Sequence, residues 1–256
     1  MPPLVLALSK HPLVEKYDVS SIRLISSGAA PLGQELEQAC ANRLGCEIYQ
    51  GYGLTEVAGA SHINTIPVPT DKVGAVGRVV PNTYSKIIDT ESGKELGFNE
   101  RGEVLIKGPH VMKGYLNNEE ATNHCIDQDG WFHTGDIGYA DEDGYFFIVD
   151  RVKELIKYKA YQVAPAELEA ILVSHEAIVD AAVIPSPDEE AGEIPKGFVV
   201  LNQDMDPKEI MDFVAEQVAP HKKIRKIEIV DEIPKSASGK ILRRVLVEQE
   251  RSKIGQ

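Results

Sequence analysis

A lysine, a threonine–glutamate pair and an aspartate each lie beside glycines in this chain, and these residue types suit phosphate chemistry. Near the C-terminal end, Lys240 follows the small residues Ser236-Ala237-Ser238-Gly239. A lysine on such a loop can bring its ammonium group to a phosphate or carboxylate and neutralise the charge that develops there. A plain linker before the last helix is the alternative interpretation.

The segment Gln50-Gly51-Tyr52-Gly53-Leu54-Thr55-Glu56 offers a second group of polar side chains. Its two glycines permit a backbone bend that a side chain would block. The Thr55 hydroxyl can donate to a phosphate oxygen, and Glu56 can hold a Mg²⁺ ion that bridges phosphates. A glycine-containing loop with Glu56 in solvent is the alternative.

Asp136 lies between glycines in Thr134-Gly135-Asp136-Ile137-Gly138, after the aromatic residues Trp131 and Phe132. A carboxylate in this setting can accept hydrogen bonds from both hydroxyls of a ribose, as in other nucleotide sites. A β-turn in which Asp136 caps the backbone is the alternative. His133 has no second base and no metal-ligand spacing beside it, so we expect it to be structural.

The segment 150–163 is basic, although the chain as a whole is acidic. Arg151, Lys153, Lys157 and Lys159 can together face a phosphorylated ligand such as a nucleotide or coenzyme A. Alternating charges on a solvated β-hairpin are the alternative.

The composition is that of a globular protein, since 43% of the 256 residues are hydrophobic and 26% are charged. The formal net charge of −13 argues against nucleic acid or an anionic membrane as the main partner. No apolar run approaches the roughly 20 residues of a membrane span. We find neither a signal peptide nor a peroxisomal C-terminal tripeptide, so we expect a cytoplasmic protein. The three cysteines lack C-x-x-C spacing, which indicates structural thiols.

Two hydrophobic patterns divide the first 149 residues. The first pattern predicts a βαβ unit of an α/β domain, with a helix at 31–44 between strands at 22–26 and 47–50. The second pattern begins at Gly74 and consists of short strands separated by turn residues. These strands are expected at 85–89, 102–107 and 145–149. We expect this β-rich part to form a distorted barrel.

After Asp150 the pattern indicates an α+β domain, and its length of about 105 residues suffices for independent folding. Its helices are expected at 165–174, 207–218 and 241–250. Its strands are expected at 178–185, 197–201 and 224–230. We therefore predict domains at 1–149 and 150–256, with the boundary at Asp150-Arg151.

Taken together and in this order, the motifs resemble those of the acyl-CoA synthetases of the adenylate-forming superfamily. The matching segments are Ser27–Gly33, Tyr52–Glu56, Gly102–Val104, Thr134–Asp136, Lys153–Lys159 and Ser238–Lys240. The resemblance covers nearly the whole chain and is closest to the 4-coumarate:CoA ligase-like branch, through residues 156–159 and 162–167. It implies that 1–149 is the C-terminal portion of a large AMP-binding domain, α/β with a β-barrel. A small, mobile α+β domain would follow.

The resemblance also implies a role for each matched residue. AMP or an acyl-adenylate would be bound by Ala29, Gln50, Gly51, Tyr52, Thr55, Asp136 and Arg151, the last two holding the ribose. Glu56 would bind Mg²⁺, and Lys159 and Ala160 would lie near coenzyme A. Lys240 would be the catalytic lysine of adenylation, whereas Lys157 and Gln162 would serve thioester formation.

The implied reaction joins a small carboxylic acid, aromatic or fatty, to coenzyme A in two steps. The carboxylate attacks the α-phosphate of ATP to give acyl-AMP and pyrophosphate, and the coenzyme A thiol then displaces AMP. Both steps need charge stabilisation at phosphate more than a titrating base. A turn of the small domain about Asp150-Arg151 would offer Lys240 in the first step and the Lys157 face in the second.

Two features depart from the family pattern. Members of the family are roughly twice as long, and their loop that binds the β- and γ-phosphates has no counterpart here. Gly28 and Gly33 have P-loop spacing, but Gln34 stands where a lysine is needed. Ala160 occupies a position where relatives commonly carry glycine. We therefore expect an incomplete ligase chain, with an inactive remnant, an interaction module or a luciferase-like oxygenase as alternatives.

Overall fold

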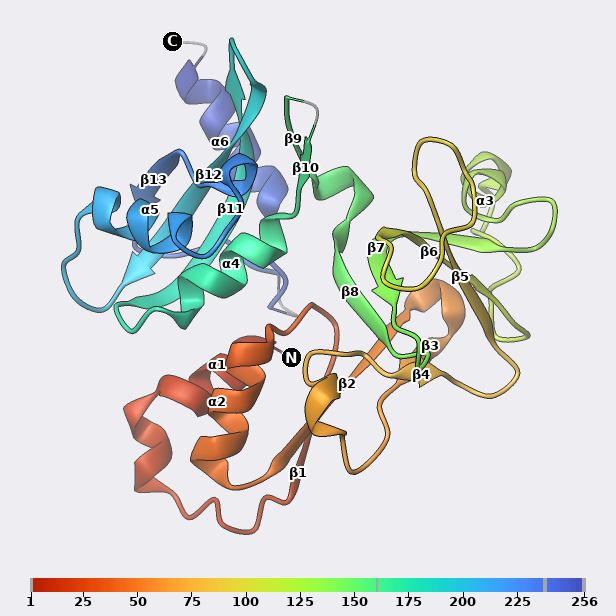
Figure 1. Ribbon diagram of the computed structural model, residues 1–256, viewed down its shortest axis with the longest axis horizontal. Helices are drawn as coiled ribbons and strands as arrows, with labels where there is room; N and C mark the ends of the chain where they lie inside the picture. Colours follow the sequence, from red (N-terminus) through yellow and green to blue (C-terminus); the bar gives the residue numbers. More distant parts are fainter. Residues whose placement is uncertain (1, 160, 237–238, 255–256) are drawn as a thin grey trace. The chain divides into compact units, whose positions relative to one another are not determined.

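A computed structural model describes residues 2–159, 161–236 and 239–254 of the chain (Figure 1). The chain folds into two compact units, residues 1–152 and 153–256, and each is described by itself below. Ala160, which was predicted to lie near coenzyme A, is outside the described residues.

The first sheet of the N-terminal unit confirms the predicted βαβ connection. Its strands lie in the order β1 (Leu24–Ser27), β2 (Glu47–Leu54), β3 (Gly59–Ile63) and β4 (Arg78–Val79). β1 and β2 are parallel and are joined through α2 (Gln34–Leu44), whereas β3 and β4 are antiparallel to their neighbours. α2 ends at Gly45, whose φ of +63° is a left-handed conformation that glycine adopts without steric cost.

A helix at the start of the chain packs against α2. This helix, α1 (Pro2–Lys10), was not predicted from the sequence. Its buried Val5 joins a cluster with Leu32, Cys40, Leu44 and Ile48. The cluster therefore covers one side of β2 with apolar side chains from both helices.

The second sheet of the N-terminal unit is antiparallel throughout. Its strands lie in the order β5 (Tyr84–Ile88), β6 (Gly102–Lys107), β7 (Phe132–Ala140) and β8 (Phe146–Arg151). We expected a distorted barrel here. Among the described residues β5 and β8 are not paired, so this sheet is open and no closed barrel is found. The physical reason is that β8 pairs elsewhere. The Phe146 N–H donates to Gly77 O (2.9 Å), and the Val76 N–H donates to Phe146 O (2.8 Å).

Short helical segments connect the strands of both units. The α-helix α3 (Glu119–Cys125) begins at Asn118, whose side chain accepts from the Ala121 N–H. The 3₁₀ segments are η1 (Pro12–Lys16), η2 (Thr55–Val57), η3 (Thr70–Lys72), η4 (Val152–Glu154) and η5 (Pro220–Lys222).

The C-terminal unit is built on a five-stranded sheet. The strands are β9 (Ile156–Tyr158), β10 (Tyr161–Val163), β11 (Ile178–Asp188), β12 (Gly192–Leu201) and β13 (Lys226–Ile229). Their order is β10-β9-β12-β11, and β13 pairs with β12 in parallel. The helices are α4 (Pro165–Ser174), α5 (Pro207–Ala215) and α6 (Arg243–Ile254). Pro165 and Pro207 both occupy a first helical turn, where a missing N–H has no cost.

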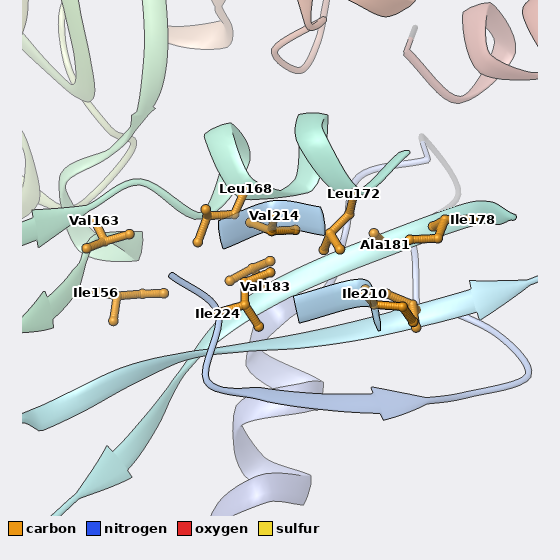
Figure 2. Packing of buried hydrophobic residues seen from close by; sticks show 11 residues of the cluster. Ile156, Val163, Leu168, Leu172, Ile178, Ala181, Val183, Ile210, Val214 and Ile224 are labelled. Carbon is orange, nitrogen blue, oxygen red and sulfur yellow. The ribbon is translucent and has the colours of Figure 1, made fainter. Parts of the chain in front are cut away.

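The two faces of this sheet carry separate apolar clusters because strand side chains alternate. Ala181 and Val183 of β11 face α4 and α5, where Leu168, Leu172, Ile210 and Val214 pack on them (Figure 2). Ala182 and Ile184 belong to the other cluster, with Phe198 of β12 and Leu246 of α6. α4 and α5 thus cover one face of the sheet and α6 covers the other.

A buried ion cluster ties α6 to the sheet. Lys196 of β12 is 7% exposed, and its ammonium lies 2.8 Å from a Glu228 oxygen and 2.5 Å from a Glu250 oxygen. The Ser186 hydroxyl donates to the other Glu250 oxygen (2.8 Å). Because a buried charge is stable only when it is paired, these contacts fix the register of α6. In the described part of the chain, no helix is long and apolar enough to span a membrane.

Replacing Leu168 by Ala should destabilise the C-terminal unit by about 2–5 kcal/mol, since this fully buried side chain would leave a cavity. Urea unfolding followed by circular dichroism measures the change. Leu242→Ala is the control, because Leu242 is 40% exposed and its truncation should cost less than about 1 kcal/mol. Equal losses in the two variants would contradict the assigned core.

Candidate adenylate site

Three strands of the N-terminal unit meet at the carboxylate of Asp136. The Tyr52 hydroxyl of β2 donates to one carboxylate oxygen at 2.6 Å. Nε of Arg151 lies 3.1 Å from the other oxygen, and Arg151 is the cross-strand partner of Asp136 between β8 and β7. Asp136 is 4% exposed, whereas 56% of the Arg151 side chain is exposed. The carboxylate is therefore held from two sides, with a guanidinium at the surface.

Thr134, Gly135 and Asp136 form a bulge inside β7 rather than a terminal turn. Leu105 pairs with His133 and Glu103 pairs with Ile137, so three residues of β7 stand opposite Val104 alone. Gly135 has a φ of +68°, which lets the extra residues leave the ladder. The Thr134 hydroxyl donates to Val104 O (2.7 Å) and accepts from the Asp136 N–H (3.0 Å). The bulge thereby turns Asp136 toward Tyr52.

A buried histidine, His62, lies beside Tyr52. The His62 ring is 4.4 Å from the Phe146 ring and 5.7 Å from the Tyr52 ring, and the residue is 0% exposed. Its Nδ1 lies 3.0 Å from the Ser61 hydroxyl, while its Nε2 has no hydrogen-bond partner among the residues that the structure describes. Burial lowers the pKa of His62 to about 3. Burial and the neighbouring Asp136 also raise the pKa of Tyr52 far above its usual range, so both groups are neutral at pH 7.

The Thr55–Glu56 pair lies on η2, directly after β2. Thr55 is exposed, and Glu56 is half-buried. The Tyr115 hydroxyl donates to a Glu56 carboxylate oxygen (2.8 Å), and the Met112 N–H donates to the Glu56 carbonyl (2.7 Å). The segment 112–115 therefore orients Glu56, a contact that no sequence pattern indicated.

Gln50 and Gly51 lie in the middle of β2 and have different surroundings. The Gln50 side chain is 3% exposed, and its amide donates to Leu32 O (3.1 Å) and to the Glu37 carboxylate (2.6 Å). These bonds hold the loop before α2, and they occupy the amide that was predicted to line the adenylate pocket. Gly51 lies beside Gly28, since a Cβ at Gly28 would stand 3.3 Å from Gly51 O.

Ala29 is exposed in the loop after β1 and has a φ of +75°. Residues other than glycine rarely adopt this left-handed conformation, which costs roughly 1–2 kcal/mol. Strain of this kind concentrates at binding loops. The geometry is compatible with the adenylate role predicted for Ala29.

The residues predicted for the second step lie together on the hairpin β9–β10. Lys157 and Gln162 are direct cross-strand partners, and both are exposed. Lys159 follows at the turn with a φ of +54°, and its ammonium lies 2.8 Å from Glu190. This hydrogen bond raises the pKa of Lys159.

Lys240 is exposed at the end of its loop. Its N–H donates to the Ser236 hydroxyl (3.2 Å), and its carbonyl accepts from the Ser236 N–H (2.9 Å). The backbone is therefore fixed by Ser236. For each of these site residues, the assigned role stays a prediction.

Comparison with known proteins shows the family. Residues 1–116 match the model of the AMP-binding enzymes, and residues 167–240 match that of the AMP-binding enzyme C-terminal domain. A 4-coumarate–CoA ligase of Pinus taeda is 54% identical over 251 residues, 96% of this chain and 47% of the pine protein. 4-coumarate–CoA ligase 1 of Glycine max is 52% identical over 256 residues, 96% of this chain and 86% of the soybean sequence.

Solved structures agree with these relatives. The anthranilate CoA ligase AuaEII, in complex with anthranoyl-AMP, superposes with a TM-score of 0.90 at 30% identity. The match covers 100% of this chain and 50% of that structure. The fold and the motif set are those of the adenylate-forming enzymes, and the chain belongs to the AMP-binding enzyme family, in its 4-coumarate–CoA ligase-like branch. The chain spans about half the length of the pine relative.

The buried imidazole of His62 should make the N-terminal unit sensitive to acid. The unfolded chain takes up a proton near pH 6.5, whereas the folded chain does so only near pH 3. Between these values the unfolded state binds more protons, so stability falls as the pH falls, by up to about tenfold in the unfolding constant per pH unit.

His62→Phe should lose less stability than the wild type between pH 7 and pH 5. Urea unfolding followed by the fluorescence of Trp131, the single tryptophan of the chain, measures this difference. His124→Gln is the control, because His124 is exposed and should behave as wild type. Parallel pH profiles for wild type and His62→Phe would contradict the buried neutral imidazole.

Replacing Ala29 by Gly should stabilise the N-terminal unit by about 0.5–1 kcal/mol, because the strain at φ +75° exceeds the entropy that glycine adds to the unfolded chain. The neighbouring Ala30→Gly variant should instead lose about 0.4–1 kcal/mol. Trp131 fluorescence in urea compares the two, and a loss of stability in both would refute the strain at Ala29.

Proposed function

We propose that this chain supplies the adenylate-binding and thioester-forming residues of an ATP-dependent carboxylate–CoA ligase. The contact set at Asp136 carries the proposal, because it presents a buried, oriented carboxylate and an exposed guanidinium from adjacent strands. Two hydroxyls of a ribose can share such a carboxylate. The 4-coumarate–CoA ligases of pine and soybean and the anthranilate CoA ligase support an aromatic acid as substrate, with a fatty acid as the wider class.

The first step would be attack of the substrate carboxylate on the α-phosphate of ATP. Thr55 donates to the phosphate from its exposed position after β2, and Lys240 neutralises the charge that develops on the phosphate and carboxylate oxygens. Asp136 and Arg151 hold the ribose, so the α-phosphate stays in place while pyrophosphate leaves. Ala29 and Gly51 contribute backbone where a larger side chain would crowd the nucleotide.

The second step would be displacement of AMP by the thiol of coenzyme A. Lys157 and Gln162 serve this step from one face of the β9–β10 hairpin, and Lys159 lies at its turn near coenzyme A, next to Ala160. We propose residues 150–151 as the hinge that brings the C-terminal unit to each step in turn. The division of the chain at 152/153 supports this position.

Mg²⁺ would be bound by Glu56. A half-buried carboxylate with one oxygen oriented by Tyr115 fits a hard cation that prefers oxygen ligands. The ion, when bound, neutralises phosphate charge.

A second candidate is a binding module without catalysis. The sequence contains no glycine-rich loop ending in lysine for the β- and γ-phosphates, and this feature favours the module. The additional length of the relatives leaves room for such a loop in a longer protein. The two candidates differ in whether the chain, joined to the remaining length of a relative, forms acyl-AMP.

Calorimetry with AMP and with a non-hydrolysable acyl-AMP mimic tests the adenylate site in this chain. Wild type should bind the mimic more tightly than AMP. Lys240→Ala should lower the affinity for the mimic by about tenfold or more, as expected for a lost charge-assisted hydrogen bond. Lys208→Ala is the control, since Lys208 is exposed on the first turn of α5.

Absence of binding in protein that is shown to be folded would rule out a self-sufficient adenylate site in this chain. Binding that is unchanged in Lys240→Ala would remove that lysine from the site.

A further inference from the structure

Glu103 belongs to a matched motif, but the proposed reaction assigns it no role. It lies in β6 with 15% of its side chain exposed. One carboxylate oxygen accepts from the Gly135 N–H at 3.0 Å, and the other lies 3.1 Å from Nδ1 of His133. Glu103 therefore contacts Gly135 inside the bulge of β7 and His133 directly before the bulge.

The bulge leaves backbone N–H groups that need hydrogen-bond acceptors outside the β-ladder. Residues 134–136 stand opposite one residue of β6, so the extra backbone N–H groups lose their partners in the ladder. The Asp136 N–H is satisfied by the Thr134 hydroxyl, and the Gly135 N–H is satisfied by Glu103. Thr134 is in turn anchored on Val104 O. The N–H groups of Gly135 and Asp136 are thus both bonded to side chains, and the acceptor for Gly135 is the carboxylate of Glu103.

His133 fixes the orientation of the Glu103 carboxylate. Its Nδ1 is within hydrogen-bond distance of a Glu103 carboxylate oxygen, and its Nε2 is 3.8 Å from a carboxylate oxygen of Asp127. Asp127 itself accepts from the Asp129 and Trp131 N–H groups at 3.0 and 2.8 Å, so its position is set by a tight turn. The imidazole is therefore held between two anchored carboxylates.

We propose that Glu103 is a positioning residue for the ribose. By holding the Gly135 N–H, it fixes the bulge that aims the Asp136 carboxylate at Tyr52 and Arg151. The proposal rests on the ribose role of Asp136 in the proposed function. It assigns Glu103 no contact with the nucleotide, so its loss acts through the aim of Asp136.

The preference for AMP over 2′,3′-dideoxy-AMP measures whether Asp136 is correctly oriented, because only AMP has the 2′ and 3′ hydroxyls of the ribose. The ratio of the two dissociation constants, measured by calorimetry, should be at least about tenfold in wild type. It should approach one in Glu103→Ala. Glu103→Gln keeps an acceptor oxygen for Gly135 and an amide N–H for His133, so it should retain the ratio of wild type.

Glu100→Ala is the matched control. Glu100 also accepts a backbone hydrogen bond in the same unit, from the Gly97 N–H at 2.6 Å, but it lies outside the bulge. Its removal should leave the ratio unchanged. Amide hydrogen exchange gives a second reading without nucleotide: Glu103→Ala should speed exchange at Gly135, and Glu100→Ala should speed it at Gly97.

A ratio in Glu103→Ala equal to that of wild type, or loss of the ratio in Glu100→Ala as well, overturns the proposal. If wild type itself does not discriminate, the ribose role of Asp136 fails and the exchange experiment decides. Unchanged protection of Gly135 in Glu103→Ala then refutes the positioning contact, whereas faster exchange supports it.

Discussion

One nearly buried carboxylate organises the N-terminal unit. Asp136 belongs to the second sheet, yet its side chain accepts from Tyr52 of the first sheet. Because a buried carboxylate without partners would be strongly disfavoured, the two sheets must meet where Tyr52 and Arg151 can both reach it. The open second sheet follows the same constraint, since β8 uses the backbone of Phe146 to bond residues 76–77. A closed barrel would need that edge of β8.

Local irregularities of the backbone place polar side chains where regular strands and helices cannot. Gly135 lets β7 bulge, Ala29 turns the loop after β1, and Lys159 turns the β9–β10 hairpin, all at positive φ. Each departure lies at or beside a residue assigned to ligand binding. Regular strands would send Asp136 and its neighbours to alternate faces of the sheet. The positions at positive φ therefore lie beside residues with proposed binding roles, and at Ala29 and Lys159 this conformation has a cost in stability.

The C-terminal unit is organised by apolar packing on both faces of its sheet. Its sheet is covered on both faces by helices, and the alternating pattern of β11 assigns successive residues to two apolar clusters. Lys196 and its two glutamates replace apolar packing at one point and thereby restrict how α6 can dock. This core supports the exposed side chains of Lys157 and Gln162 on the β9–β10 hairpin and of Lys240.

The sequence by itself determined the elements whose signals are local. Periodicity predicted α4, α5, β6 and the βαβ unit, and the order of short motifs predicted the family to which the chain belongs. It missed α1, whose helical pattern is short. It predicted a distorted barrel but could not show that the second sheet stays open, because the pairing of edge strands depends on residues distant in the chain. Only the tertiary structure decided that Gln50 holds Glu37, that Tyr115 orients Glu56 and that Glu103 holds the bulge. These contacts join residues 13, 59 and 32 positions apart, and no local spacing encodes which side chains meet across such separations.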